Sequence, residues 1–367
     1  MYCDDRYKNP MILENEVQKY DPSDMRKLIA EFPRQATEAV AIGKSFSCSI
    51  DGKSIRNIIV SGLGGSAIGG DILRAFSADT IRVPFQVNRN YTLPEYVDEK
   101  TLVIIASYSG NTEETISAYK DALRRRAKIV CISSGGEISR RAKKIDQPLI
   151  TIPGGLPPRA ALGYSFFPVL LLLHKLKFIP SPEKEIRETL ALLAKKSDLY
   201  QGAEGESNPA FSIAKRLHGK LPVVYSAAER FDVVNVRWRG QISENAKVLA
   251  YGHIYPEMNH NELVGWSTTF HKGNTATPNM DDIAVVILHD KNDHKRVQMR
   301  MEITRKIIAQ CASDIIDVRS EGTSLLARMF SLIYLGDWTS YFLALLNHVD
   351  PTPVKAIDYL KNELSKQ

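Results

Sequence analysis

The sequence has few cysteines and no long apolar run. Four cysteines, with no CxxC pair among them, are spread over 367 residues, so the spacing of a zinc site or of a disulfide framework is missing. So few cysteines favour a reducing cytoplasm. The longest continuous apolar run, residues 166–173, contains a proline and is far shorter than the ~20 residues of a membrane span. The first residues include Asp4, Asp5 and Arg6 in place of the apolar core of a signal peptide.

A strong excess of one charge is also missing. The 48 basic and 42 acidic side chains give a net charge of +6, and the basic residues are spread along the chain. The one short cluster, residues 124–126, is typical of a solvated helix face rather than of a nucleic-acid patch. We therefore expect neither a nucleic acid nor a membrane as partner. Apolar residues at 44% and charged residues at 25% exclude wholesale disorder, and the length favours two domains.

What the sequence does contain is a repeated alternation of short apolar runs and helical stretches. Continuous apolar strands separated by helices predict parallel sheets covered by helices on both faces. The predicted strands are residues 57–60, 83–87, 101–106, 128–132, 148–152, 221–227, 283–288 and 315–318. The predicted helices include residues 112–126, 138–144, 230–247, 297–310, 325–347 and 353–366, and residues 11–45 carry helical spacing.

A polar stretch at residues 201–208 separates two halves of similar design. We place one domain at residues 1–200 and a second at residues 201–367, each a mainly parallel sheet flanked by helices in three α/β/α layers. The last predicted helix, residues 353–366, follows Asp350-Pro351-Thr352. In that sequence Thr352 is placed to cap the helix, and Pro353 suits its first position.

Two segments carry signs of anion chemistry, and the first is the glycine-rich stretch at residues 60–71. It follows a predicted strand and opens a helix, and its glycines let a backbone approach an anion. A dinucleotide fingerprint is a poor match, because Gly62-Leu63-Gly64-Gly65-Ser66-Ala67 lacks the third glycine in register. The acidic residue expected after the next strand is also missing, since Asn88 stands there.

The second segment is Ser107-Tyr108-Ser109-Gly110-Asn111-Thr112-Glu113-Glu114-Thr115. It too follows a strand and opens a helix, and it offers the hydroxyls of Ser107, Ser109 and Thr112 beside successive amides. Hydroxyls and helix-terminal N–H groups suit a phosphate monoester without a metal. A capping box, in which a Ser or Thr is followed by a Glu, is the simpler alternative, and by itself it would explain Ser109 and Thr112.

These motifs resemble the sugar isomerase (SIS) domain family. Within it, the chain is similar to the bifunctional phosphoglucose/phosphomannose isomerases along nearly its whole length. The motifs that carry the resemblance are the 107–115 segment, Gly64-Gly65-Ser66 with Gly69-Gly70-Asp71, residues 157–164, residues 244–247, residues 256–262 and residues 350–354. The resemblance implies two SIS-type subdomains and a substrate phosphate held by Gly64, Gly65, Ser66, Ser107, Ser109 and Thr112.

The resemblance also implies an aldose–ketose isomerisation of glucose 6-phosphate, and of mannose 6-phosphate, with fructose 6-phosphate through an enediol. Glu244 stands where the family carries its base, and His260 where the family opens the sugar ring. Arg159 corresponds to the family arginine beside the enediolate. A guanidinium suits that place because it stays charged at every working pH and can stabilise negative charge without titrating. Without the family, Glu244 reads as a helix-surface residue and Arg159 as part of a surface salt bridge.

Thr352 resembles the family threonine at a turn where other glucose-6-phosphate isomerases place a larger amide. A smaller side chain there leaves room for both C2 epimers. Lys361 matches the family lysine that assists ring opening, with Lys355 as the competing candidate. The resemblance implies neither a metal nor a redox cofactor, because enediol chemistry with a carboxylate base and an arginine needs no Lewis acid.

Finally, the resemblance implies a homodimer with a shared active site, in which His260 is the side chain borrowed from the partner. The alternative is a non-catalytic SIS module that binds a sugar phosphate for regulation. Such a module has a use for the 107–112 loop, but none for Glu244, His260 and Arg159 together.

Overall fold

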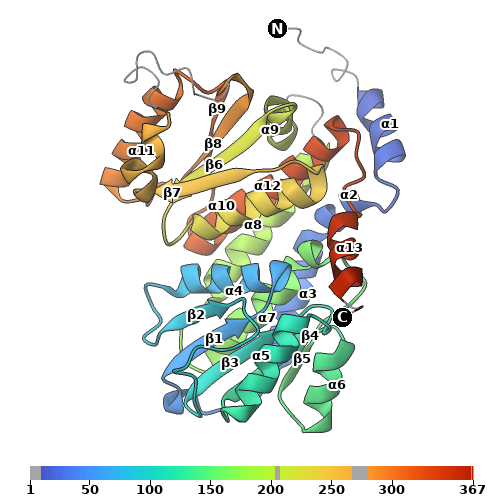
Figure 1. The fold of residues 1–367 in the computed structure, drawn as a ribbon, viewed down its shortest axis with the longest axis vertical. Coiled ribbons are helices and arrows are strands. Elements are labelled where there is room, and N and C mark those ends of the chain that lie inside the picture. The colour runs from blue at the N-terminus through green and yellow to red at the C-terminus, as the bar shows by residue number, and fades with distance from the viewer. Residues whose placement is uncertain (1–9, 203–206, 267–279, 365, 367) are drawn as a thin grey trace. The chain divides into compact units, whose positions relative to one another are not determined.

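The computed structural model describes residues 10–202, 207–266, 280–364 and 366. These residues form two compact units (Figure 1). The N-terminal unit comprises Glu31–Ala194 and Ser324–Ala327, and the C-terminal unit comprises the described parts of Met1–Ala30, Lys195–Thr323 and Arg328–Gln367. Residues 10–30 thus group with the C-terminal unit, while domain limits at 1–200 and 201–367 stay a prediction.

The N-terminal unit contains a five-stranded parallel sheet in the order β2-β1-β3-β4-β5. Its strands are β1 (Asn57–Ser61), β2 (Phe85–Asn88), β3 (Thr101–Ala106), β4 (Lys128–Ser133) and β5 (Leu149–Thr151). All five strands were predicted, to within about two residues at each end. β3 is buried along its whole length, as expected for a central strand with helices on both faces.

Helices cover both faces of this sheet (Figure 1). The helices are α3 (Phe32–Ser45), α4 (Gly64–Ser77) and α7 (Leu162–Lys175) on one face, and α5 (Glu113–Arg124) and α6 (Gly136–Lys144) on the other. Along β3, Val103 and Ile105 join the core beneath α5, where Tyr119 is buried. On the opposite face α4 approaches β1 so closely that a Cβ on Gly70 would lie 2.8 Å from Val60 Cγ1. The alternation of strand side chains thus builds three layers.

The C-terminal unit contains a four-stranded parallel sheet in the order β7-β6-β8-β9. Its strands are β6 (Leu221–Ala227), β7 (Tyr251–Tyr255), β8 (Ile283–His289) and β9 (Asp314–Arg319). β6, β8 and β9 were predicted, whereas β7 was not. β7 is an edge strand that begins at an exposed tyrosine, Tyr251, and its mixed composition gives no continuous apolar run.

Helices flank this second sheet as well, with α11 on one side and α10 and α12 on the other (Figure 1). The helices of this unit include α1 (Pro10–Tyr20), α2 (Met25–Ala30), α9 (Pro209–Leu217), α10 (Asp232–Gln241), α11 (Lys295–Ile308) and α13 (Lys355–Leu364). α8 (Glu183–Gly202) and α12 (Leu325–Leu346) run from one unit into the other. α2 is tied to α12 by the Tyr334 hydroxyl, which donates to the Ile29 carbonyl at 2.9 Å.

α12 is the one described helix whose length and apolar composition would allow it to cross a membrane. Its whole apolar window is buried inside the protein. Trp338, at its middle, stacks on Phe342 and contacts Tyr334 and Tyr341 edge-on. Burial of this kind is the setting of a core helix.

Two predicted helices have different bounds in the structure. Residues 230–247 do not form one helix, because α10 ends at Gln241 and a π-helical turn, η5 (Ile242–Ala246), follows. Lys247 then closes the turn in the left-handed conformation, at φ 59°. The prediction that Thr352 caps the last helix is wrong, since α13 begins at Lys355. The first carbonyl to accept from the helix is that of Val354, bonded to the Ile357 and Asp358 amides, while the Pro353 carbonyl accepts from the Lys247 ammonium at 2.7 Å.

Candidate active site

Three loops of the N-terminal unit meet at the carboxyl edge of its sheet. They follow β1, β3 and β4, which are neighbours in the sheet, and this edge is where open parallel sheets bind ligands. The first two loops are joined directly, because the buried Ser66 hydroxyl accepts a hydrogen bond from the Tyr108 amide at 3.1 Å. The two segments in which the sequence showed anion chemistry are therefore neighbours in the fold.

The hydroxyl groups of the 107–112 loop form hydrogen bonds within the loop. Ser107 Oγ donates to Thr112 Oγ1 at 3.2 Å, and the Ser109 hydroxyl accepts from the Asn111 amide at 3.3 Å. Thr112 is the N-cap residue of α5, but its side chain makes no capping hydrogen bond. The capping box therefore does not explain Thr112. A cluster of hydroxyls at the start of a twelve-residue helix fits an anion site better.

Main-chain contacts with the 133–138 loop hold the 107–112 loop in place. Gly110 has a φ of 71°, and a Cβ added to it would lie 1.9 Å from the Gly135 carbonyl oxygen. The Ile138 amide donates to the Gly110 carbonyl at 3.0 Å, and the Glu137 amide donates to Asn111 Oδ1 at the same distance. Only glycine fits at position 110, so this loop is fixed chiefly by its own backbone.

Arg159 lies in a 3₁₀ turn, η3 (Pro158–Ala160), against the start of α4. A Cβ on Gly65 would lie 2.5 Å from the Pro158 carbonyl oxygen, so glycine permits this close approach. Gln35 braces the turn by donating to the Ala160 carbonyl at 2.7 Å. Arg159 is only 4% exposed, which excludes the surface salt bridge considered from the sequence.

The N-terminal unit thus brings together Gly65, Ser66, Ser107, Thr112 and Arg159. Gly64 and Ser109 belong to the same two loops and are exposed. Gln35 and Asn111 complete the supports of this cluster. Sequence reasoning missed both as supports, because Gln35 lies outside the motifs, and the contact of Asn111, although it stands within the 107–115 motif, is with a loop distant in the chain.

In the C-terminal unit, Glu244 occupies the π-helical turn after α10 and is half-buried. Its neighbours anchor the turn to α12 and to the residue that follows that helix. Asn245 Nδ2 donates to Ser340 Oγ at 2.9 Å, and Asn347 Nδ2 donates to the Ala246 carbonyl at 3.1 Å. Glu244 is therefore held by a fixed backbone rather than carried on a free helix surface.

Thr352 is half-buried in the turn before α13, and its amide donates to Asp350 Oδ1 at 2.8 Å. The structure brings this turn and the Glu244 turn together, because the Lys247 ammonium donates to main-chain carbonyls in both. Lys361 and Lys355 are both exposed on α13, so the choice between them stays open.

His260 ends a 3₁₀ turn, η6 (Glu257–His260), which follows a cis peptide bond at Pro256. The imidazole is exposed, while the backbone beside it is anchored. Met258 is fully buried, and Arg300 Nη1 donates to Asn259 Oδ1 at 3.3 Å.

A second anchor lies on the other side of His260. The Tyr225 hydroxyl donates to Glu262 Oε1 and accepts from Trp266 Nε1 at 2.8 Å. Burial, followed by the hydrogen bond to the Glu262 carboxylate, raises the pKa of the Tyr225 phenol, so this hydroxyl stays protonated and keeps donating. Tyr225 was not identified from the sequence because it lies in the middle of β6, within an apolar run.

His260 and Glu244 lie at opposite ends of β7. The Glu244 turn precedes the amino end of this strand, and η6 follows its carboxyl end. A strand of five residues spans about 16 Å at ~3.3 Å per residue. One chain thus places its candidate base and its candidate histidine at different edges of the same sheet.

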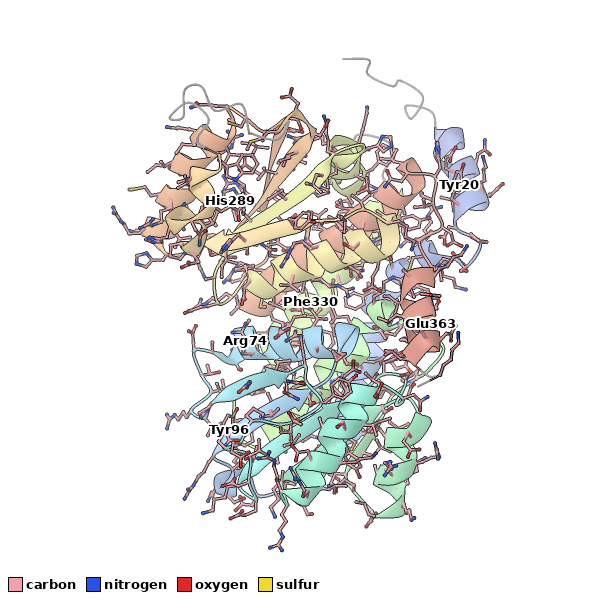
Figure 2. The ribbon with its side chains drawn as sticks, in the orientation of Figure 1. Tyr20, Arg74, Tyr96, His289, Phe330 and Glu363 are labelled. Atoms are coloured by element: carbon pink, nitrogen blue, oxygen red, sulfur yellow. The ribbon has the colours of Figure 1, made fainter. Side chains whose placement is uncertain are left out.

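Two histidines outside the candidate site, His289 and His294, have structural partners. His289 is the last residue of β8 (Figure 2), and its Nε2 lies 2.8 Å from Asp317 Oδ1 of β9. His294 accepts from the Arg296 amide at the start of α11. Within the described ranges, no three His, Cys, Asp or Glu side chains gather as a ligand set for a metal ion.

Two family models match the chain. Residues 53–152 match the SIS domain, and residues 206–364 match the bacterial phosphoglucose isomerase C-terminal SIS domain. A solved structure, a hypothetical protein from Thermus thermophilus, superposes with a TM-score of 0.75 at 15% identity, over 97% of this chain and 94% of that one. This likeness shows the fold, and the predicted pair of SIS-type α/β subdomains is confirmed.

Relatives of higher identity identify the family. A protein from Caldicellulosiruptor bescii, named bifunctional phosphoglucose/phosphomannose isomerase, is 46% identical over 93% of this chain and 99% of its own length. A protein of the same name from Aquifex aeolicus is 39% identical over 85% of this chain and 91% of its own length. The chain belongs to the family of bifunctional phosphoglucose/phosphomannose isomerases.

Proposed function

We propose that the chain interconverts glucose 6-phosphate and mannose 6-phosphate with fructose 6-phosphate through a cis-enediol, with Glu244 as the base and His260 opening the sugar ring. The activity follows from the family, and the roles of the residues are the proposal. The observation that carries these roles is the fixed π-helical turn that holds Glu244 next to the Thr352 turn.

The 6-phosphate is assigned to the loop cluster of the N-terminal unit. Backbone amides at the starts of α4 and α5 and the hydroxyls of Ser66, Ser107, Ser109 and Thr112 provide neutral donors for a dianion. Gly64 and Gly65 leave the α4 amides uncovered by side chains. A site of this kind needs no titrating group, so phosphate binding is expected to depend on pH only through the phosphate itself.

The chemical step moves one proton between two carbons. In the open-chain aldose, the Glu244 carboxylate removes the proton from C2 and returns it to C1, while the proton on the C2 hydroxyl moves to O1 in the enediol and O2 becomes the ketone. Negative charge develops on the enediolate oxygens, and a guanidinium such as that of Arg159 stabilises it. His260 exchanges protons with the ring oxygen and the C1 hydroxyl before this step.

The shared active site of a homodimer fits the positions of Glu244 and His260. Both residues must act on one hexose, yet they lie at opposite ends of β7 within one chain, which supports a partner's His260 beside each Glu244. We expect a mixture of Glu244→Gln and His260→Gln proteins, unfolded and refolded together, to regain activity, because a mixed dimer has one intact site. A mixture as inactive as its components would contradict the sharing. Sedimentation gives the oligomeric state independently.

Thr352 is proposed to admit both C2 epimers. A larger amide in the turn before α13 would occupy the space near C1 and C2. The axial C2 hydroxyl of mannose 6-phosphate would then have the least room in the site. Thr352→Gln is expected to lower mannose 6-phosphate turnover much more than glucose 6-phosphate turnover. Equal losses for the two epimers would sink this role.

The proposed location of the protein is the cytoplasm. The proposed chemistry uses a carboxylate, an imidazole and a guanidinium and requires no metal ion. Activity is expected to survive prolonged dialysis against EDTA, measured with both epimers. Loss of activity with the chelator, restored by one divalent cation, would refute a metal-independent mechanism.

The decisive experiment is a coupled assay from fructose 6-phosphate to glucose 6-phosphate on wild type and Glu244→Gln. Removal of a general base predicts a loss of about 10²–10⁴-fold in kcat. Glu302→Gln, on an exposed position of α11, is the matched control and should keep wild-type activity. Sugar-phosphate binding by the wild type without turnover would instead favour the regulatory SIS module.

A further inference from the structure

Lys247 has an unusual backbone and an unusual set of acceptors. Its φ of 59° places a non-glycine residue in the left-handed region, a conformation that residues with a Cβ seldom adopt. Its ammonium donates to three main-chain carbonyls, those of Glu244, Pro351 at 3.1 Å and Pro353 at 2.7 Å. An ammonium has three donors, so all three are used on the protein itself.

The three acceptors belong to the two turns that carry the proposed base and the proposed specificity residue. Glu244 supplies one carbonyl, and the prolines on either side of Thr352 supply the others. Because Pro351 and Pro353 have no N–H group, this turn has few backbone donors with which to hold its own shape. The Lys247 ammonium closes it from outside and ties it to the Glu244 backbone across more than a hundred residues of sequence.

The links around Lys247 differ in what they hold. Asn347 joins the end of α12 to the Ala246 carbonyl, so this bond fixes the Glu244 turn. Asp350 accepts from the Thr352 amide, so that bond shapes the Thr352 turn from within. The Lys247 ammonium instead donates to both turns at once and so links the backbone of Glu244 to the prolines on either side of Thr352.

We propose that Lys247 is a positioning residue that sets the C2-epimer selectivity of the isomerase by fixing the Thr352 turn relative to Glu244. This inference rests on the proposed roles of Glu244 and Thr352. The Lys247 side chain takes no part in proton transfer, because its donors are bound to carbonyls. It acts on the reaction through the width of the space at C1 and C2 of the sugar.

The test is Lys247→Met, with initial rates measured separately for glucose 6-phosphate and mannose 6-phosphate. Methionine keeps much of the side-chain length and removes all three hydrogen bonds. A misplaced active-site group commonly costs up to ~10²-fold, and we expect kcat/KM for mannose 6-phosphate to fall about fivefold more than that for glucose 6-phosphate. Lys247→Arg, which can still donate to carbonyls, should recover part of the epimer ratio.

The matched control is Lys291→Met, because Lys291 is an exposed lysine of the same unit whose ammonium donates to the carbonyl of Gly322 at 2.9 Å. Its epimer ratio should equal that of wild type. Equal losses for both epimers in Lys247→Met, or no rescue of the ratio by arginine, would overturn the positioning role and leave Lys247 as a stabilising residue only.

The inference can fail separately from the proposed function. Full activity of Glu244→Gln would remove the base assignment whatever Lys247 does. If Glu244→Gln is inactive and Lys247→Met has an unchanged epimer ratio, the assignment of Glu244 as the base stands and the positioning role of Lys247 is contradicted. If Lys247→Met yields too little folded protein, the Lys247→Arg ratio decides alone, since a shift in selectivity is expected there too, in the same direction and smaller.

Discussion

The N-terminal and C-terminal units hold their candidate site residues by different means. In the N-terminal unit, the 107–112 loop is held chiefly through its backbone, whose groups bond to the Ile138 amide and to the Ser66 and Ser134 hydroxyls, and by glycines that leave no room for a side chain. In the C-terminal unit, the turns around Glu244, Thr352 and His260 are fixed by side chains, chiefly Lys247 and Tyr225, that reach across the fold.

The difference matches what each unit is proposed to bind or do. A phosphate dianion is bound well by a rigid ring of amides and hydroxyls, which a backbone can supply directly. Proton transfer requires carboxylate and imidazole groups, and these must be held by further side chains. We therefore expect the N-terminal site to be sensitive to backbone substitutions, and the C-terminal site to side-chain truncation and to pH.

Among the variants that test this comparison, the largest effect is expected for Gly110→Ala. The added Cβ would lie 1.9 Å from the Gly135 carbonyl oxygen, at a φ of 71°, so the 107–112 and 133–138 loops must separate. We expect KM for fructose 6-phosphate to rise about 100-fold, since misplacement of binding groups by ~1 Å costs that much. Steady-state kinetics and the inhibition constant of inorganic phosphate measure the loss.

Gly155→Ala separates backbone strain from the clash. Gly155 has a φ of 90°, and a Cβ there would meet nothing within 4 Å. Both substitutions carry the strain of the left-handed region, about 1–2 kcal/mol, but only Gly110→Ala disturbs the loops. Similar phosphate affinities for the two variants would contradict the expectation that phosphate binding in the N-terminal unit depends on the close contact of the 107–112 and 133–138 loops.

A smaller loss of activity is expected for Tyr225→Phe. The hydroxyl holds Glu262, two residues beyond His260, and accepts from Trp266. Its removal leaves a carboxylate and an indole N–H without this partner, which costs about 1–3 kcal/mol of stability. Looser positioning of His260 should lower kcat about tenfold, with the largest loss for substrates that must be ring-opened.

Tyr255→Phe is the matched control for that experiment. Its hydroxyl is buried in the same core and shares a 2.7 Å hydrogen bond with Thr304 on α11, whereas the Tyr225 hydroxyl donates to Glu262. Both variants should lose stability in thermal unfolding, but only Tyr225→Phe should lose activity below the melting transition. Equal activity in the two would show that the His260 loop does not depend on this anchor.

The fold was largely predictable because both sheets are parallel and buried. Buried strands such as β3 and β6 stand out as continuous apolar runs between helices. β7 was missed since an edge strand with an exposed Tyr251 and a glycine has no such run. The helix predicted over residues 230–247 is interrupted because α10 ends at Gln241 and a π-helical turn follows, closed by the left-handed backbone of Lys247. This turn contacts Asn347, Pro351 and Pro353, which lie more than a hundred residues away in the chain, so its local sequence does not reveal it.

The site was predictable where the chemistry is local. Ser107, Ser109 and Thr112 lie in one loop, so their spacing alone indicated an anion site. The anchors were not predictable, because Gln35, Tyr225 and Lys247 act on groups far away in the chain. Thr352 was predicted as a helix cap from its position before a proline, but α13 begins at Lys355, and the Pro353 carbonyl accepts from the distant Lys247 ammonium.

The smallest effects concern two aspartates of the C-terminal unit whose pKa values move in opposite directions. Burial, and then repulsion from Asp290, outweigh the hydrogen bond from the Asp290 amide and raise the pKa of Asp293 to about 6. The hydrogen bond from Arg216, with its Nε at 2.6 Å, lowers the pKa of Asp314. The pair tests whether charged side chains make this unit sensitive to pH.

Between pH 4 and 6 the folded protein binds a proton at Asp293 that the unfolded chain releases, so this group lowers the free energy of unfolding as the pH rises through that window. Asp293→Asn, whose amide oxygen can still accept from Asp290, should therefore raise stability at pH 7 by about 1 kcal/mol, after allowance for solvent screening, and leave it unchanged at pH 4.

Asp314→Asn should do the reverse. The ion pair with Arg216 is intact above the unfolded pKa of the carboxyl group, so its loss costs up to about 1 kcal/mol at pH 7, and the cost disappears as the pH falls. Thermal unfolding of both variants at the two pH values measures these differences. Parallel pH dependences in the two variants would show that charge at these positions does not govern the stability of the C-terminal unit.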